Sequence, residues 1–255
     1  MIRNRLKELM DVRGLKATRI ANDINNLSRN TINSTVSNSG KMIQFETVNL
    51  LCQYLGVTPK EFFEYLPFDV LVSVDADNDP IVDTPNDDQN VAPDPNDCFI
   101  KPFYLNLYLT KTSNNYSSGE SKKTFELSVI SDKEIPFESS NEFGNNNFIM
   151  LTPSFKVVLG NPPIEKNMKS QKEEFFNFWN DDLTDGFRQV IQQKIINSIY
   201  DYFSNFQSIN NYIEIPSYMP VIFPFDDFNS DYSNLNSGIV MTYKNSIFAD
   251  DELPF

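Results

Sequence analysis

Five segments with apolar residues at helical spacing follow one another within residues 1–66. Helices this short bury a single apolar stripe each, so they are stable only when they pack around a shared core. Gly14 and Gly56 provide natural helix ends, because glycine adopts the left-handed backbone that closes a helix. The expected helices are Ile2–Met10, residues 17–24, Ser28–Ser37, about Phe45–Leu55 and a short segment after Thr58. The sequence therefore predicts an all-α N-terminal domain over residues 1–66, here called the head.

The start of the fifth segment carries the clearest local signal in the chain. Thr58 occupies the N-cap position, Pro59 the first helical position and Glu61 the third, which is a capping box with a preset proline. We expect Phe62, Phe63 and Leu66 to follow it and to close the core of the head.

The segment Ser28–Ser37 has a chemistry that differs between its two faces. Ser28 can cap the helix, and Ile32 and Val36 lie four residues apart, so both face inward. The remaining side chains suit DNA: arginine pairs with guanine, asparagine with adenine, and serine or threonine with phosphate or the thymine methyl group. The outward set consists of Arg29, Asn30, Thr31, Asn33 and Ser34. We interpret the segment as a recognition helix; the alternative, an ordinary capped surface helix, would suffice if the segment stood alone.

The order and spacing of these helices resemble the Xre-type family of the Cro and lambda-repressor fold. The resemblance covers about the first quarter of the chain and implies a DNA-binding repressor or activator that acts as a dimer on a near-palindromic site. The matching residues are Arg19-Ile20-Ala21, Ile24, Ser28-Arg29-Asn30-Thr31-Ile32, Leu51-Cys52-Gln53-Tyr54-Leu55-Gly56-Val57-Thr58-Pro59 and Phe62-Phe63.

Two positions depart from the pattern of that family. Its members commonly join the second and third helices through a glycine-containing turn, where this chain has Asn25-Asn26 in a turn one residue longer. Asparagine tolerates the left-handed backbone that such a turn requires. The family also places glutamine at the start of the second helix to contact a phosphate; Ala17 occupies that position here, so Lys16, Thr18 or Arg19 must replace the contact.

The other basic residues of the head carry weaker signals. Arg3, Arg5 and Lys7 are expected to form a solvated helix face rather than a DNA contact. Lys41 follows the recognition helix in a loop that often meets the DNA backbone, and we include it with Thr18 and Arg19 among the candidate DNA contacts.

Charge is divided unevenly along the chain. Residues 1–66 hold nine lysines and arginines against six acidic residues, a net charge of +3. The whole chain has a net charge of −14, so residues 67–255 hold twelve basic and 29 acidic residues, a net charge of −17. Because the acidic part repels DNA, any nucleic-acid contact should belong to the head.

Composition excludes several classes of protein. The chain has no histidine, which excludes Ser-His-Asp triads, Cys-His pairs and histidine-ligated zinc. Cys52 and Cys98 are expected to be reduced thiols. The acidic run that begins at Asp75 fails the spacing of a calcium loop, since Pro80 and Asn86 replace the required glycine and glutamate. Because the sequence shows no long apolar run and no signal peptide, we expect a cytoplasmic protein without a membrane segment. We also expect no enzymatic activity, no metal and no cofactor.

Residues 67–255, here called the body, are predicted to form an α+β domain with a mostly antiparallel sheet and one long or broken helix. Alternation predicts strands at residues 68–74, 103–109, 125–129, 147–151, 155–159, 212–215, 220–223 and 238–243. Residues 75–97 are rich in Asp, Asn and Pro and are expected to form an exposed loop or linker. A capping box at Ser170–Glu173 begins a helical stretch to Phe206, with a break near Asp181–Gly186; we favour a core helix over a dimer seam.

Two functions of different class follow. The first is a sequence-specific transcriptional regulator, a dimeric repressor of phage or mobile-element type, in which the head binds double-stranded DNA and the body dimerises, senses an effector or binds a protein partner. The alternative is an anti-CRISPR or other anti-defence protein, whose acidic body blocks a nucleic-acid-handling enzyme while the head regulates its own gene.

Overall fold

The computed structural model of the protein describes residues 1–38, 40, 42–77, 80–83, 94–115, 117, 119–131, 133–140, 147–150, 155–160, 169–209, 213–214, 219–223 and 239–242. Within these residues the chain packs around two hydrophobic cores. The core of the head is formed by buried side chains from Leu6 to Phe62, and that of the body by buried side chains from Leu66 to Phe223.

The head contains short helices whose inward side chains meet in one cluster. Its helices are α1 (Leu6–Val12), α2 (Ala17–Asp23), α3 (Arg29–Val36), α4 (Phe45–Leu55) and α5 (Pro59–Phe62). One side chain from each helix is fully buried there: Leu6, Ile20, Ile32, Leu51 and Phe62. Gly56 ends α4 with a left-handed backbone (φ 65°), as its position predicted.

The expectation of an all-α head with a helix from Ile2 is wrong at the N-terminus. Ile2–Asn4 forms strand β1, which pairs antiparallel with β2 (Phe63–Tyr65), so Ile2 lies opposite Tyr65 at the surface. The Asn4 side chain accepts a hydrogen bond from the Leu6 backbone N–H and so starts α1 after the strand. Leu66 also differs from the prediction, since it packs in the core of the body.

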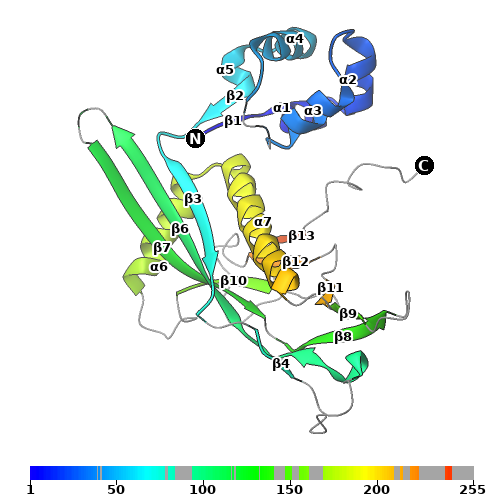
Figure 1. Cartoon of the computed structure of the whole chain (residues 1–255). Coiled ribbons are helices and arrows are strands. Elements are labelled where there is room, and N and C mark those ends of the chain that lie inside the picture. The colour runs from blue at the N-terminus through cyan, green and yellow to red at the C-terminus, as the bar shows by residue number, and fades with distance from the viewer. Residues whose placement is uncertain are drawn as a thin grey trace.

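The strands in the described part of the body form two sheets. The larger has the strand order β13-β12-β10-β7-β6-β3, and its pairings are antiparallel except for β10 with β12. Its strands are β3 (Asp69–Asp75), β6 (Tyr104–Asn115), β7 (Gly119–Ser131), β10 (Phe155–Leu159), β12 (Pro220–Phe223) and β13 (Ile239–Thr242). Strands β6 and β7 form a long hairpin that extends well beyond the rest of the sheet (Figure 1).

A second sheet of short strands has the order β11-β9-β8-β5-β4. Its strands are β4 (Val82–Asp83), β5 (Phe99–Ile100), β8 (Ile135–Ser140), β9 (Asn147–Met150) and β11 (Ile213–Glu214). The short 3-10 helix η1 (Pro95–Asp97) precedes β5. Strand β4 pairs with β5, and Pro80 and Pro95 are buried, whereas Ile81, Asp94 and Asn96 are exposed. The loop or linker expected at residues 75–97 therefore includes short segments that pack against the body. Residues 78–79 and 84–93 of that loop lie outside the described residues.

A broken helix packs on the larger sheet (Figure 1). It consists of α6 (Lys169–Phe176), the π-helical turn η3 (Asn177–Asp182) and, after Leu183-Thr184, α7 (Asp185–Ile209). The break falls where the sequence predicted it, although α6 already begins at Lys169. Its inward side chains, among them Trp179, Phe187 and Ile195, are fully buried in the core of the body, which favours the core interpretation over a dimer seam.

Both cysteines are free and buried, Cys52 in the head and Cys98 in the body, as expected. None of the helices in the described part of the chain has the length and apolar character needed to cross a membrane.

Candidate nucleic-acid interface

Helix α3 separates a buried face from a polar outer face. At 3.6 residues per turn, positions 29, 33, 37, 30 and 34 share an arc of about 140°. On this arc Arg29, Asn30 and Ser34 are exposed and Asn33 is half-buried. On the opposite side Ile32 is fully buried and Thr35 is 8% exposed. The helix thus presents an arginine and two asparagine side chains together on one side of the head.

The first turn of α3 is fixed by the cap that the sequence predicted. The Ser28 hydroxyl accepts a hydrogen bond from the Thr31 backbone N–H at 3.0 Å. The hydroxyls of Ser28 and Thr31 also lie 2.8 Å apart, and the Ser34 hydroxyl donates to the Thr31 carbonyl oxygen. The hydroxyls of these three residues therefore make hydrogen bonds within the first turns of the helix. The side chains of Arg29 and Asn30 are exposed.

Helix α2 presents the two candidate phosphate contacts. Thr18 and Arg19 are exposed on it, and 70% of the Arg19 side chain is accessible. Arg19 Nε lies 3.7 Å from the Asp23 carboxylate, which also accepts a hydrogen bond from the Tyr54 hydroxyl at 2.6 Å. That hydrogen bond raises the pKa of Tyr54 and connects α4 to the C-terminal end of α2.

The turn between α2 and α3 closes without the left-handed residue that the family comparison suggested. Neither Asn25 nor Asn26 has a positive φ, and the Leu27 backbone N–H donates to the Ile24 carbonyl oxygen at 3.2 Å. Leu27 is buried in the core of the head. The longer turn therefore retains a packed connection between the two helices.

Sequence reasoning missed the residues that hold the C-terminal end of α3. Asn38 follows the last turn with a left-handed backbone (φ 51°), and its side chain bonds to both the backbone and the side chain of Asn4. Asn4 in turn donates to the Thr35 carbonyl oxygen at 2.8 Å. An asparagine one residue past the C-cap of a helix is a known signal for this backbone, but its partner is 34 positions away and cannot be inferred locally.

The three basic residues near the start of the head differ in exposure. Arg5 and Lys7 are exposed, as expected, whereas Arg3 is 8% exposed and pairs with Glu64 and Glu8. The solvated-face prediction is therefore wrong for Arg3, because the residue belongs to a strand that lies between the two parts of the chain. Lys41 lies outside the described residues.

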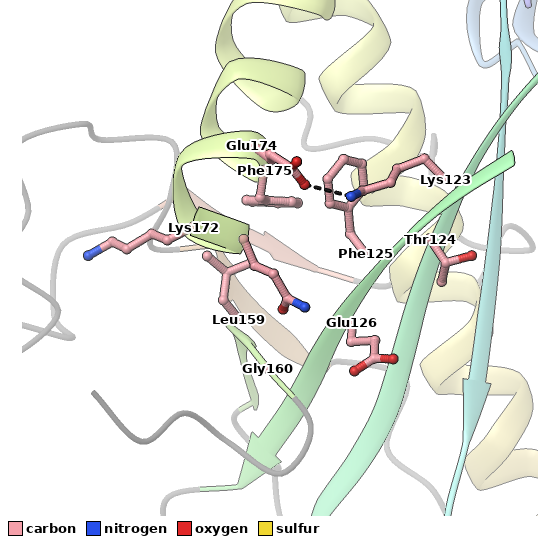
Figure 2. A pocket seen from close by; sticks show the side chains of 10 residues that line it. Lys123, Thr124, Phe125, Glu126, Leu159, Gly160, Lys172, Glu174 and Phe175 are labelled. Atoms are coloured by element: carbon pink, nitrogen blue, oxygen red, sulfur yellow. Dashed lines mark hydrogen bonds and ion pairs between the residues drawn. The ribbon is translucent and has the colours of Figure 1, made fainter. Parts of the chain in front are cut away.

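The described part of the body has a small pocket and, beside it, a wider and more open hollow of about 430 Å³ that Lys111, Phe125 and Phe178 line among others. Figure 2 shows a pocket between α6 and β7, across which Lys123 Nζ pairs with the Glu174 carboxylate at 2.6 Å. Phe125 and Phe175 pack edge to face beside it. The pocket has a volume of about 30 Å³, which suits ordered water rather than an effector molecule. Within the described residues no group of three or more acidic or cysteine side chains is placed to hold a metal ion.

Comparison with known proteins agrees with the geometry of the head. A family model described as a Cro/C1-type HTH DNA-binding domain matches residues 5–67. No curated protein and no solved structure matches the chain. Residues 5–67 therefore form a helix-turn-helix domain of the Cro/C1 type, the type to which the Xre-family resemblance pointed.

Proposed function

We propose that the protein is a sequence-specific transcriptional regulator of the dimeric repressor type, with α3 in the major groove of its operator. The observation that carries the proposal is the outer arc of α3, where Arg29, Asn30 and Asn33 stand on a helix whose inner face is fixed in the core. Arginine and asparagine are the residues that pair with guanine and adenine in two-point hydrogen bonds.

In this proposal the other candidate residues set the position of the helix on DNA. Thr18 and Arg19 on α2, with Ser28, Thr31 and Ser34 on α3, contact phosphates or sugars at the edges of the groove. Lys41, which follows α3 in the sequence, remains a predicted contact of the same kind. Such contacts add affinity without sequence preference and are lost as salt rises.

Dimerisation supplies the remaining affinity. With a net charge of only +3, one head neutralises few phosphates, so a single head binds weakly and two linked heads bind far more tightly. A two-fold dimer places its recognition helices about 34 Å apart, one turn of DNA. The body, with a net charge of −17, lies away from the DNA and provides the dimer contact. An acidic surface is common in soluble proteins, so the anti-defence alternative gains no support from it.

The test is the loss of sequence discrimination in two variants. Arg29→Ala and Asn30→Ala should each reduce the preference for the operator over random duplex by about 1–3 kcal/mol, roughly 5- to 150-fold. Operators are selected from the DNA upstream of the gene, and binding is measured by fluorescence anisotropy at fixed salt. Because both side chains are exposed, the unfolding midpoint should stay unchanged.

Matched controls separate base recognition from charge. Lys60→Ala removes an exposed cation from α5, and Asn49→Ala removes an exposed asparagine from α4. Both controls should retain the preference for the operator. Equal binding of the wild-type dimer to operator and random duplex would refute the proposal.

A further inference from the structure

Strand β1 has one side chain toward the body and the next toward the recognition helix. It consists of Ile2–Asn4 and lies before residues 5–67, which the family model matches. Antiparallel pairing with β2 places Arg3 opposite Glu64 and Asn4 opposite Phe63. Because successive side chains of a strand point to opposite faces, Arg3 and Asn4 face different neighbours.

Arg3 connects the strand to helix α7 of the body. Its Nε lies 2.5 Å from the Glu64 carboxylate and its Nη1 lies 2.6 Å from that of Glu8, so the buried charge is paired on two sides. The guanidinium carbon also lies 5.5 Å from the centre of the Phe187 ring, in the first turn of α7. Planar guanidinium groups favour such stacking on aromatic rings.

Gly186 provides the space for this contact. A Cβ atom added at position 186 would overlap the Arg3 guanidinium, and glycine avoids the overlap. The guanidinium has little freedom to retreat, since both carboxylates hold it in a buried position. A side chain as small as alanine at position 186 would therefore displace Arg3 from the body.

Asn4 connects the same strand to the end of α3. Its side-chain amide donates to the Thr35 carbonyl oxygen at 2.8 Å and to the Asn38 side-chain oxygen at 2.7 Å. Its backbone N–H donates to that same oxygen at 2.8 Å, and its carbonyl oxygen accepts from the Asn38 amide at 3.1 Å. Four hydrogen bonds thus join Asn4 of β1 to Thr35 in the last turn of the recognition helix and to Asn38 just beyond its C-cap.

We propose that β1 couples the body to the recognition helix, with Arg3 and Asn4 as positioning residues. A change in the first turn of α7 shifts Arg3, and a shift of the three-residue strand moves or releases the C-terminal turn of α3. The body thereby sets the placement of the helix that carries Arg29, Asn30 and Asn33. The coupling itself concerns the free protein; only its effect on DNA binding rests on the function proposed above.

The decisive variant is Gly186→Ala in the full chain, read out by amide hydrogen exchange of α3 without DNA. Alanine favours the helical backbone of α7, so the body should stay folded, with unchanged exchange along most of α7. We expect exchange in residues 29–38 to become faster by on the order of tenfold, because the anchored turn opens locally. Gln189→Ala, an exposed substitution in the same helix, should leave α3 exchange as in the wild type.

Two further variants test whether the effect of α7 on α3 passes through Arg3 and Asn4. Arg3→Lys keeps the charge but loses the planar contact with Phe187, and should shift α3 exchange in the same direction by a smaller factor. In an Asn4→Ala background, Gly186→Ala should add no further effect on α3, since the connection is already broken. Wild-type α3 exchange in both Gly186→Ala and Arg3→Lys would overturn the proposal, as would fully additive effects in the double variant.

Binding to the selected operator separates this proposal from the previous one. Weaker operator binding by Gly186→Ala, together with faster α3 exchange, supports the coupling and its role. Faster α3 exchange in a protein that shows no operator preference leaves the coupling supported and refutes the proposed function. Specific operator binding with both α3 exchange and affinity unchanged by Gly186→Ala refutes the coupling alone.

Discussion

At the scale of single residues, the capping box at α5 shows how a local signal becomes a stable helix end. The Glu61 backbone N–H donates to the Thr58 hydroxyl, while the Glu61 carboxylate accepts from the Thr58 backbone N–H at 2.7 Å and from its hydroxyl at 2.8 Å. The backbone hydrogen bond is the main reason that the pKa of Glu61 is lower than its ordinary value. Charge on this carboxylate therefore stabilises the folded head.

The cap predicts how two substitutions act on stability. Thr58→Ala should lower the free energy of unfolding by about 1 kcal/mol, because an N–H group at the helix start loses its acceptor. Urea unfolding of the full chain, followed by circular dichroism, measures the change. Lys60→Ala, an exposed neighbour, should change stability by less than about 0.5 kcal/mol and serves as control.

Glu61→Gln should act in a pH-dependent way. Since the pKa of Glu61 is lowered in the folded state, its contribution is fully present above its unfolded pKa and is lost as the pH falls through the folded one. The variant should therefore be less stable than the wild type at neutral pH, and the two unfolding midpoints should converge in acid. If the difference between the two unfolding midpoints stayed constant from neutral to acidic pH, the charge of Glu61 would not be the stabilising group.

At the scale of elements, the broken helix on the larger sheet decides how the body is stabilised. Helix α7 covers β3, and its inward side chains, Phe187, Ile191 and Ile195 among them, are fully buried. Lys194 lies on the same helix, and its ammonium group donates a hydrogen bond to the Val70 carbonyl oxygen of β3 at 3.1 Å. Burial lowers the pKa of Lys194. The helix is thus a structural part of the body core rather than a free surface.

Removing one inward side chain tests this role. Ile191→Ala should lower the free energy of unfolding by about 2–5 kcal/mol, because it leaves a cavity beneath the helix. Chemical denaturation gives the value, and Gln193→Ala, exposed on the same helix, should stay within about 0.5 kcal/mol of the wild type. A loss below about 1 kcal/mol for Ile191→Ala, accompanied by dissociation of a dimer, would instead favour the seam interpretation.

At the scale of the whole molecule, two hydrophobic cores of unequal size share one chain. The smaller core in the head contains Cys52, and the larger core in the body contains Cys98. Burial is the main cause that raises the pKa of both thiols, so both are poor nucleophiles in the folded protein. Each cysteine therefore reports on the opening of its own core.

Thiol labelling in rising urea should separate the two cores. We expect Cys52 to react at a lower urea concentration than Cys98, because the smaller core is stabilised by less buried apolar surface. Mass spectrometry of peptides after pulse labelling assigns each site, and the variants Cys52→Ala and Cys98→Ala confirm the assignment. Reaction of Cys98 first would show that the body opens before the head.

Much of the head could be predicted because its helix ends depend on neighbours in sequence. Ser28, Gly56 and the Thr58–Glu61 box each act within four residues, and α3 and α5 begin, and α4 ends, where these signals place them. The placement of Ile2–Asn4 could not be predicted in this way. Its apolar spacing matched a helix, but its partner strand Phe63–Tyr65 is about sixty residues away, and local spacing cannot reveal such a partner.

The sequence by itself determined the caps, the apolar stripes and the polar outer arc of α3, since these follow from side-chain chemistry at fixed local spacing. Only the tertiary structure decided that Arg3 is buried against Phe187 and Gly186, and that Asn4 holds the end of α3 through Asn38. The physical reason is that a charge or an amide is buried only where its partners are already assembled. Those partners come from distant parts of the chain, and folding alone brings them together.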